Sequence, residues 1–124
     1  MKFSKKELEA VLKITVAMAS ADGVVTQIET NFIAYELSRF GVEPAQTGAL
    51  IDETVALPFE TAISVIKSLD EEQKYYVCAF MAGVMSCDGE VDTTELRLWQ
   101  YTCQLCSLPH TTLDDAIEYM HNLD

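Results

Sequence analysis

Basic residues are scarce in this sequence of 124 residues. Eight Lys and Arg stand against twenty Asp and Glu, which gives a formal net charge of −12 at pH 7. A protein that binds the phosphate backbone of a nucleic acid needs clustered Lys and Arg, so this balance argues against a nucleic-acid partner. An excess of carboxylates instead favours cations, a basic protein surface or simple solubility.

Long apolar runs are also missing. No run approaches the roughly 20 residues that span a bilayer. Glu7, Glu9 and Lys13 interrupt the apolar segment that would follow the basic start of a secretory leader. The sequence therefore predicts a cytoplasmic protein without membrane insertion, and in that compartment its four cysteines are expected to be reduced.

Helix breakers are few, with three Pro and five Gly, and no stretch keeps the alternating pattern of a strand. Apolar residues make up 49% of the chain and aromatic residues 9%, which suits one globular domain with an aliphatic core. We predict an all-α bundle of about seven helices in a single domain over residues 1–124. The expected helices lie at residues 4–21, 26–40, 44–57, 59–69, 70–87, 92–106 and from 111 or 112 onward.

A ten-residue stretch occurs twice. Residues 20–29 read SADGVVTQIE, and residues 86–95, sixty-six positions later, read SCDGEVDTTE. Ser, the Asp-Gly pair, Val and Glu recur at the same five offsets, and each copy follows an apolar run and precedes an amphipathic one. Such internal similarity indicates a duplicated helical hairpin, with pseudo-repeats over about 4–58 and 70–124.

The repeated stretch has two interpretations, which its sequence leaves open. In the first, Asp-Gly ends one helix and a capping box starts the next, formed by Thr26 with Glu29 and by Asp92 with Glu95. In the second, the acidic residues bind a hard divalent cation of the Ca²⁺ or Mg²⁺ class.

The cation interpretation rests on the spacing of an EF-hand loop. Asp, Gly, Val and Glu of each copy fall on the fifth, sixth, eighth and twelfth positions of such a loop. Both copies carry an apolar residue at the first position, where the loop needs an acidic one, so neither is an EF-hand. Affinity is expected to be weak unless the two copies converge in space. The candidate metal ligands are Asp22, Glu29, Asp88, Glu90, Asp92 and Glu95.

Residues 19–29 and 86–95, with the expected helix count and the near-twofold duplication, resemble the TerB-like family. This is the all-helical domain of tellurite-resistance proteins, related to the N-terminal domain of membrane-anchored DnaJ-type co-chaperones. The resemblance covers most of the chain. It implies a compact helical bundle in stress-response assemblies, with acidic residues suspected of binding metal ions and no established catalysis. Carried over by position, these residues are Asp22, Glu29, Asp88 and Glu95, with Glu36 as a further candidate. We expect no membrane anchor or J-domain, and a role in tellurite resistance itself is not predicted.

The cysteines raise further hypotheses. Cys103 and Cys106 have the Cys-x-x-Cys spacing of zinc and redox sites. Every cysteine, however, aligns with an apolar residue of the first repeat, which favours buried positions in the core. The aligned pairs are Cys78 with Leu12, Cys87 with Ala21, Cys103 with Leu37 and Cys106 with Phe40. Zinc binding and redox activity remain as alternatives.

An enzyme would need a nucleophile, a base and an orienting residue, and no such combination is visible in the sequence. A Gly-x-Ser-x-Gly elbow and a Gly-rich phosphate loop are absent, and His110 and His121 are expected on the surface. We predict a non-catalytic module that binds a divalent cation and an unidentified protein partner, with a homodimer as a further option. The competing hypothesis is a structural or protein-interaction domain whose repeated turns are helix caps alone.

Overall fold

The computed structural model describes residues 1–20 and 25–123, which fold into seven α-helices without a strand. The predicted all-α bundle is therefore confirmed. Two short 3₁₀ helices, η1 (Pro44–Gln46) and η2 (Thr54–Ala56), flank the third α-helix. The α-helices are α1 (Lys5–Ala19), α2 (Gln27–Ser38), α3 (Thr47–Glu53), α4 (Phe59–Lys67), α5 (Glu71–Ser86), α6 (Thr93–Leu105) and α7 (Leu113–Asn122).

The segment predicted as one helix over residues 44–57 is divided into η1, α3 and η2. Pro44 is the first residue of η1, where its fixed φ and missing N–H are tolerated. At the other end Leu57 is extended, with ψ 122°, because the residue before a proline avoids the helical conformation. The apolar spacing that predicted one helix over residues 44–57 is therefore shared by three consecutive short helices.

Side-chain caps fix most helix starts. Ser4, Thr26, Asp70 and Asp92 each accept a hydrogen bond from the backbone N–H three residues ahead. In each case the Glu or Gln at that position accepts a bond from the N–H of the capping residue. Thr112 caps α7 by accepting from the N–H three residues on, at 3.1 Å. Each cap stabilises its helix by about 1 kcal/mol, so these starts are determined locally.

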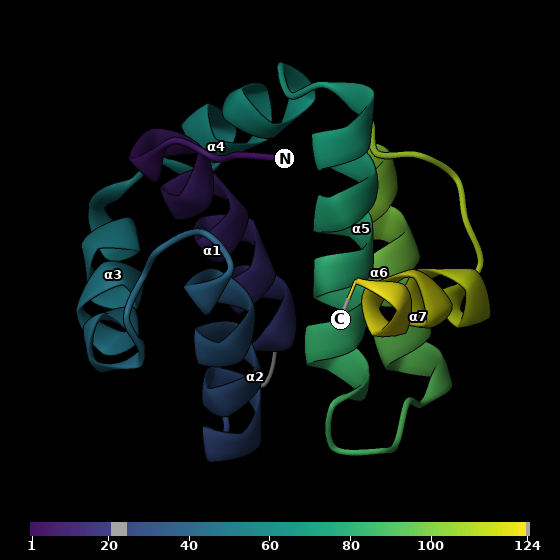
Figure 1. Cartoon of the computed structure of the whole chain (residues 1–124). Coiled ribbons are helices and arrows are strands. Elements are labelled where there is room, and N and C mark those ends of the chain that lie inside the picture. Colours follow the sequence, from purple (N-terminus) through teal and green to yellow (C-terminus); the bar gives the residue numbers. More distant parts are fainter. Residues whose placement is uncertain (21–24, 124) are drawn as a thin grey trace.

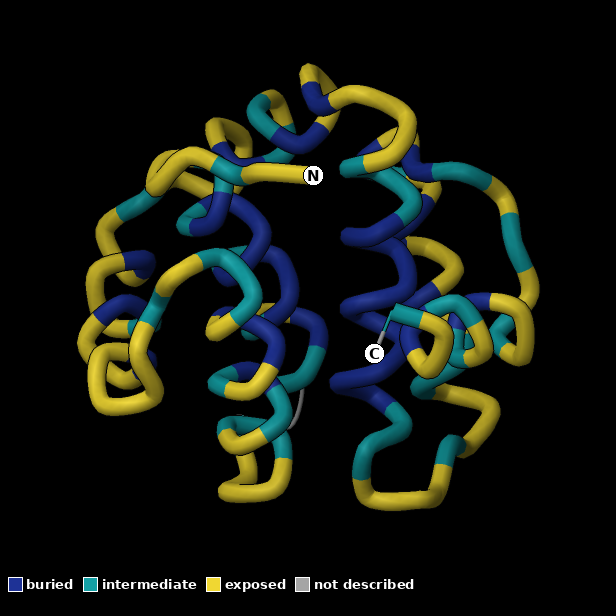
Figure 2. Tube along the Cα trace, viewed as in Figure 1, coloured by how far each residue is buried: buried dark blue, intermediate teal, exposed yellow. Residues whose placement is uncertain are grey.

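The central element is α5, with α1 to α4 on one side of it and α6 and α7 on the other (Figure 1). The largest helix contacts are those of α1 with α4 and of α5 with α7. Every residue of α5 from Tyr76 to Met85 is buried, and the buried zone follows the helix through the molecule (Figure 2). A helix that is apolar on all faces needs neighbours on all faces, which explains its central place.

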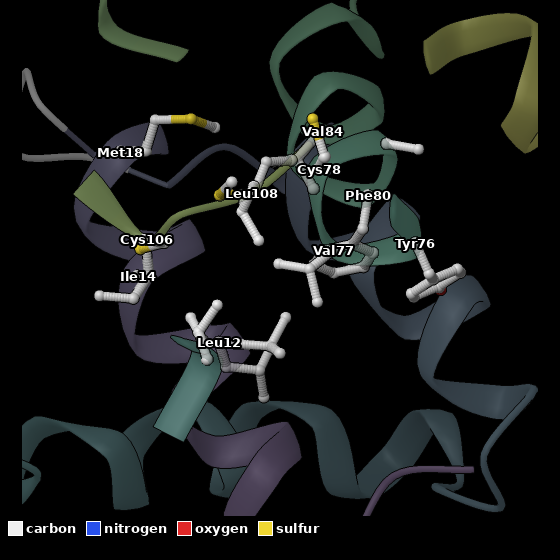
Figure 3. Packing of buried hydrophobic residues seen from close by; sticks show 14 of the residues in the cluster. Leu12, Ile14, Met18, Tyr76, Val77, Cys78, Phe80, Val84, Cys106 and Leu108 are labelled. Carbon is white, nitrogen blue, oxygen red and sulfur yellow. The ribbon is translucent and has the colours of Figure 1, made fainter. Parts of the chain in front are cut away.

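Both halves of the chain contribute to the core. Figure 3 shows Leu12 and Ile14 of α1 across from Val77 and Phe80 of α5, and all four are at most 2% exposed. In the second half, the buried indole Nε1 of Trp99 donates to a backbone carbonyl of α5 at 3.1 Å. Within the described residues, no helix is long and apolar enough to cross a membrane.

The helices α2 and α5 approach each other closely at Gly83. A Cβ at this position would overlap the ring of Phe32 on α2. Glycine is required here by the packing of the facing helix, since Gly83 has an ordinary helical backbone within α5. The close approach holds the first hairpin against the central helix.

Candidate functional site

The second copy of the repeated stretch forms the turn between α5 and α6. Gly89 has φ +90°, in the left-handed region that favours glycine, and its N–H donates to the carbonyl of Ser86 at 2.9 Å. The N–H of Glu90 donates to Oδ1 of Asp88 at 3.2 Å. The predicted helix end is therefore confirmed for this copy. The equivalent turn of the first copy, including the candidate ligand Asp22, lies outside the described residues.

Both capping boxes form at the helix starts that follow the turns. At α2, the N–H of Glu29 donates to Thr26 Oγ1 at 3.1 Å, and the N–H of Thr26 donates to Glu29 Oε1 at 2.8 Å. At α6, the N–H of Glu95 donates to Asp92 Oδ1 at 2.8 Å, and the N–H of Asp92 donates to Glu95 Oε1 at 3.2 Å. The cap interpretation thus accounts for one oxygen of each glutamate.

The two helix starts face a common cavity of about 470 Å³. Its polar lining comes from Glu29 of α2 and from Asp92, Thr94 and Glu95 of α6. The rest of the lining is Met18, Ala19, Met85 and Leu98. In Figure 1 the starts of α2 and α6 lie at the same end of the bundle. Glu29 and Glu95, which hold the same position in the two copies of the repeated stretch, therefore line one cavity.

The electrostatics agree with this proximity. Burial raises the pKa of the Cys87 thiol at the end of α5, and the negative charges of Glu29 and Asp88 raise it further. The carboxylate of Glu29, at the start of α2, is therefore close enough to the end of α5 to raise the pKa of Cys87. Three of the six candidate ligands line the cavity, whereas Asp88 and Glu90 are exposed in the turn.

The donor chemistry of the cavity suits a hard cation. Carboxylate and hydroxyl oxygens are ligands that Ca²⁺ and Mg²⁺ prefer, and the capping boxes use only Oε1 of each glutamate. Each Oε2 thus takes no part in its capping box. Among the residues that the structure describes, no three His, Cys, Asp or Glu side chains are grouped to hold a metal ion. The oxygen donors that line the cavity are therefore of the type that a hard cation prefers, but a full coordination shell would need further ligands.

Glu36, the further candidate from the resemblance, takes part in a different cluster. It is 2% exposed and accepts a hydrogen bond from the hydroxyl of Tyr76 at 2.6 Å. Arg39 donates to it through Nε at 3.0 Å and Nη2 at 3.3 Å, and through Nη1 to the carbonyl of Leu123 at 3.4 Å. Burial, followed by the Glu36 carboxylate, raises the pKa of Tyr76 well above its usual range. Both oxygens of Glu36 are thus engaged: Glu36 joins α2 to α5 through Tyr76, and its partner Arg39 makes the bond to Leu123 at the end of α7.

The cysteines lie mainly in the core, as predicted. Cys78, Cys103 and Cys106 are buried, and Cys87 is half-buried. The closest sulfur pair does not belong to the Cys-x-x-Cys motif, because Sγ of Cys78 lies 3.4 Å from Sγ of Cys103. Sequence reasoning missed this pair, which joins two different helices with no regular spacing between them. Both histidines are exposed, as expected.

Comparisons with known proteins agree with the fold. The family model for tellurite resistance protein TerB matches residues 9–118. A crystal structure of a protein of unknown function from Porphyromonas gingivalis W83 is similar to this chain, with 35% sequence identity and a TM-score of 0.87. The match covers 97% of this chain and 98% of that one. No curated protein matches the sequence.

Proposed function

The chain belongs to the TerB family of tellurite resistance proteins, and we propose that it is a non-catalytic module that binds a divalent cation. The cation is of the Ca²⁺ or Mg²⁺ class and is held where the starts of α2 and α6 meet. The module contacts a protein partner in a cytoplasmic stress-response assembly. Its net charge of −12 favours a partner with a basic surface.

The observation that carries the proposal is the position of Glu29 and Glu95. These equivalent residues of the two repeats line the same cavity, together with Asp92 and Thr94. Carboxylates gathered in a strongly acidic chain repel one another, and a bound cation removes that repulsion. We infer that ligands from the two helices act on one ion, which is the condition for useful affinity.

The ligands would come from both repeats. Glu29 and Glu95 can offer Oε2 while each Oε1 keeps its capping bond. Asp88 and Glu90 lie on the adjoining turn, and Asp22 holds the equivalent place in the first copy of the sequence. A bound cation would supply charge neutralisation and a link between the two hairpins. That role requires no reacting side chain, which is why we propose a binding module rather than an enzyme.

A second candidate function is a protein-interaction domain without a metal. The two complete capping boxes favour it, since they account for Thr26, Glu29, Asp92 and Glu95 without any ligand. The two functions differ in one measurable property. A cation that binds only the folded state raises the stability, by about 2.7 kcal/mol when its concentration is one hundred times Kd.

The test is thermal unfolding of chelator-stripped protein with and without millimolar Ca²⁺, Mg²⁺, Mn²⁺ or Zn²⁺. The informative variant is Glu29→Gln/Glu95→Gln, because glutamine keeps the capping bond and removes the charge. The matched control, Glu7→Gln/Glu71→Gln, removes two charges at the other end of the bundle, and Glu7 is likewise a capping-box residue.

For a domain of this size, saturation by a tightly bound cation corresponds to a rise in Tm of roughly 10 °C. We expect a rise specific to one cation that is lost in Glu29→Gln/Glu95→Gln and kept in the control. A rise that survives in both variants would mean general screening of the acidic charge. No rise with any cation would leave the interaction domain as the function.

A further inference from the structure

Two buried thiols face each other between α5 and α6. Cys78 is 1% exposed and Cys103 is 8% exposed, and their sulfur atoms are 3.4 Å apart. Neither residue lines the cavity between Glu29 and Glu95, so the pair is independent of the proposed cation site. We propose that Cys78 and Cys103 are a redox-active dithiol, which a hydroperoxide converts into an internal disulfide between α5 and α6.

Local hydrogen bonds hold Cys78 in place and affect the pKa of its thiol. When the Cys78 thiol donates to the carbonyl of Pro109 at 3.9 Å, the Cys103 thiol can donate to the Cys78 sulfur. The indole of Trp99 donates to the Cys78 carbonyl at 3.1 Å and fixes the backbone. The hydrogen bond with Cys103 lowers the pKa of Cys78 against the opposing effect of burial, whereas the same bond and burial together raise the pKa of Cys103. Cys78 is therefore the attacking thiol and Cys103 the resolving one.

A cavity borders the pair. Its volume is about 620 Å³, and both Cys78 and Cys103 line it. It lies between α6 and the following segment 108–112, which runs along the outer side of the second half (Figure 1). Hydrogen peroxide is only slightly larger than water and fits such a space. Cys106 is fully buried and does not line this cavity, and Cys87 lines a different one.

The reaction consumes one hydroperoxide per pair. The Cys78 thiolate attacks one peroxide oxygen, the O–O bond breaks, and the leaving oxygen takes a proton to become water, or an alcohol from an organic hydroperoxide. Cys78 is then a sulfenic acid. The Cys103 sulfur attacks it, the S–S bond forms, and the S–O bond breaks. The departing hydroxide leaves as water with the proton of Cys103. Two thiols are oxidised to a disulfide, and the peroxide is reduced.

The geometry allows the bond with small adjustments. A disulfide needs an S–S distance of about 2.05 Å, and the sulfurs start 3.4 Å apart. Rotation of two side chains on adjacent helices can supply the difference. The product would tie α5 to α6 and close the loop that contains the repeated turn. A cross-link over such a loop restricts the unfolded chain, so the oxidised form is expected to have a higher Tm.

The test uses two double variants with equal numbers of thiols. Cys87→Ser/Cys106→Ala keeps only the proposed pair, and Cys78→Ala/Cys103→Ala keeps only the other two cysteines. Circular dichroism first establishes that both fold. After treatment with hydrogen peroxide, thiol titration and intact mass are measured. We expect the first variant alone to lose both thiols and the mass of two hydrogens as a monomer, with recovery by dithiothreitol.

Peptide mapping of the oxidised wild-type chain provides a second measurement that does not depend on the folding of variants. Cleavage with trypsin and chymotrypsin under non-reducing conditions separates all four cysteines, because Phe80 lies between Cys78 and Cys87 and Leu105 between Cys103 and Cys106. A linked peptide containing Cys78 and Cys103 supports the proposal. A linkage of any other pair, oxygen addition without a link, or unreacted thiols would overturn it.

Discussion

Tyr76→Phe tests the buried carboxylate cluster. The substitution removes only the hydroxyl that donates to Glu36 Oε1 at 2.6 Å. The ring keeps its contacts with Phe3, Phe40 and Phe80. A hydrogen bond to a charged group contributes about 1.5–3 kcal/mol, and the carboxylate that loses it is 2% exposed, so water does not replace it readily. We expect the free energy of unfolding to fall by about 2 kcal/mol.

Urea denaturation at neutral pH measures this loss. The midpoint should fall while the slope m stays the same, because the surface exposed on unfolding is unchanged. In thermal unfolding the same loss corresponds to roughly 8 °C in Tm. Tyr101→Phe is the matched control, since Tyr101 is 62% exposed and its variant should stay within about 0.5 kcal/mol of wild type. A loss from Tyr76→Phe no larger than that of the control would refute the role given to the cluster.

A double-mutant cycle separates the hydrogen bond from other effects of the substitution. Glu36→Gln replaces the charged acceptor of the Tyr76 hydroxyl by a weaker, neutral one and also removes the charge that pairs with Arg39 at 3.0 Å. Groups in direct contact show interaction energies of about 0.5–3 kcal/mol. The losses in Tyr76→Phe and Glu36→Gln should therefore fail to add in the double variant. Additive losses would mean that the two side chains contribute independently.

Alkaline pH and helix packing provide two further predictions. Because the folded-state pKa of Tyr76 is raised above the ordinary value of 10.0, the unfolded chain releases that proton first. The contribution of Tyr76 to stability is therefore fully present below about pH 10 and is lost as the pH rises above it. This group alone lowers the free energy of unfolding by up to about 1.4 kcal/mol per pH unit. Denaturation at several alkaline pH values should therefore show a shallower loss of stability in Tyr76→Phe than in the wild type. Gly83→Ala should lose about 1–3 kcal/mol, since the new Cβ meets the Phe32 ring. Gly48→Ala, in open space on α3, should gain up to about 1 kcal/mol, and equal melting temperatures for the two glycine variants would contradict this account.

Local chemistry made the helices and their starts predictable. A capping box involves residues three positions apart, so Thr26 with Glu29 and Asp92 with Glu95 could be recognised before any packing was known. The apolar run of α5 likewise indicated a buried helix, and it is the central one. The prediction was weakest between residues 44 and 57, where short 3₁₀ turns share the apolar spacing of a longer helix.

The sequence by itself determined the helical class, the caps, the duplication and the burial of most cysteines, because these depend on residue type and on spacing along one element. Only the tertiary structure decided that Glu29 and Glu95 share a cavity and that Glu36 binds Tyr76 and Arg39. It also decided that Cys78, rather than the neighbouring Cys-x-x-Cys partner, meets Cys103. Contacts between helices depend on how each pair packs, and side chains far apart in the chain meet only after the core has fixed those packings.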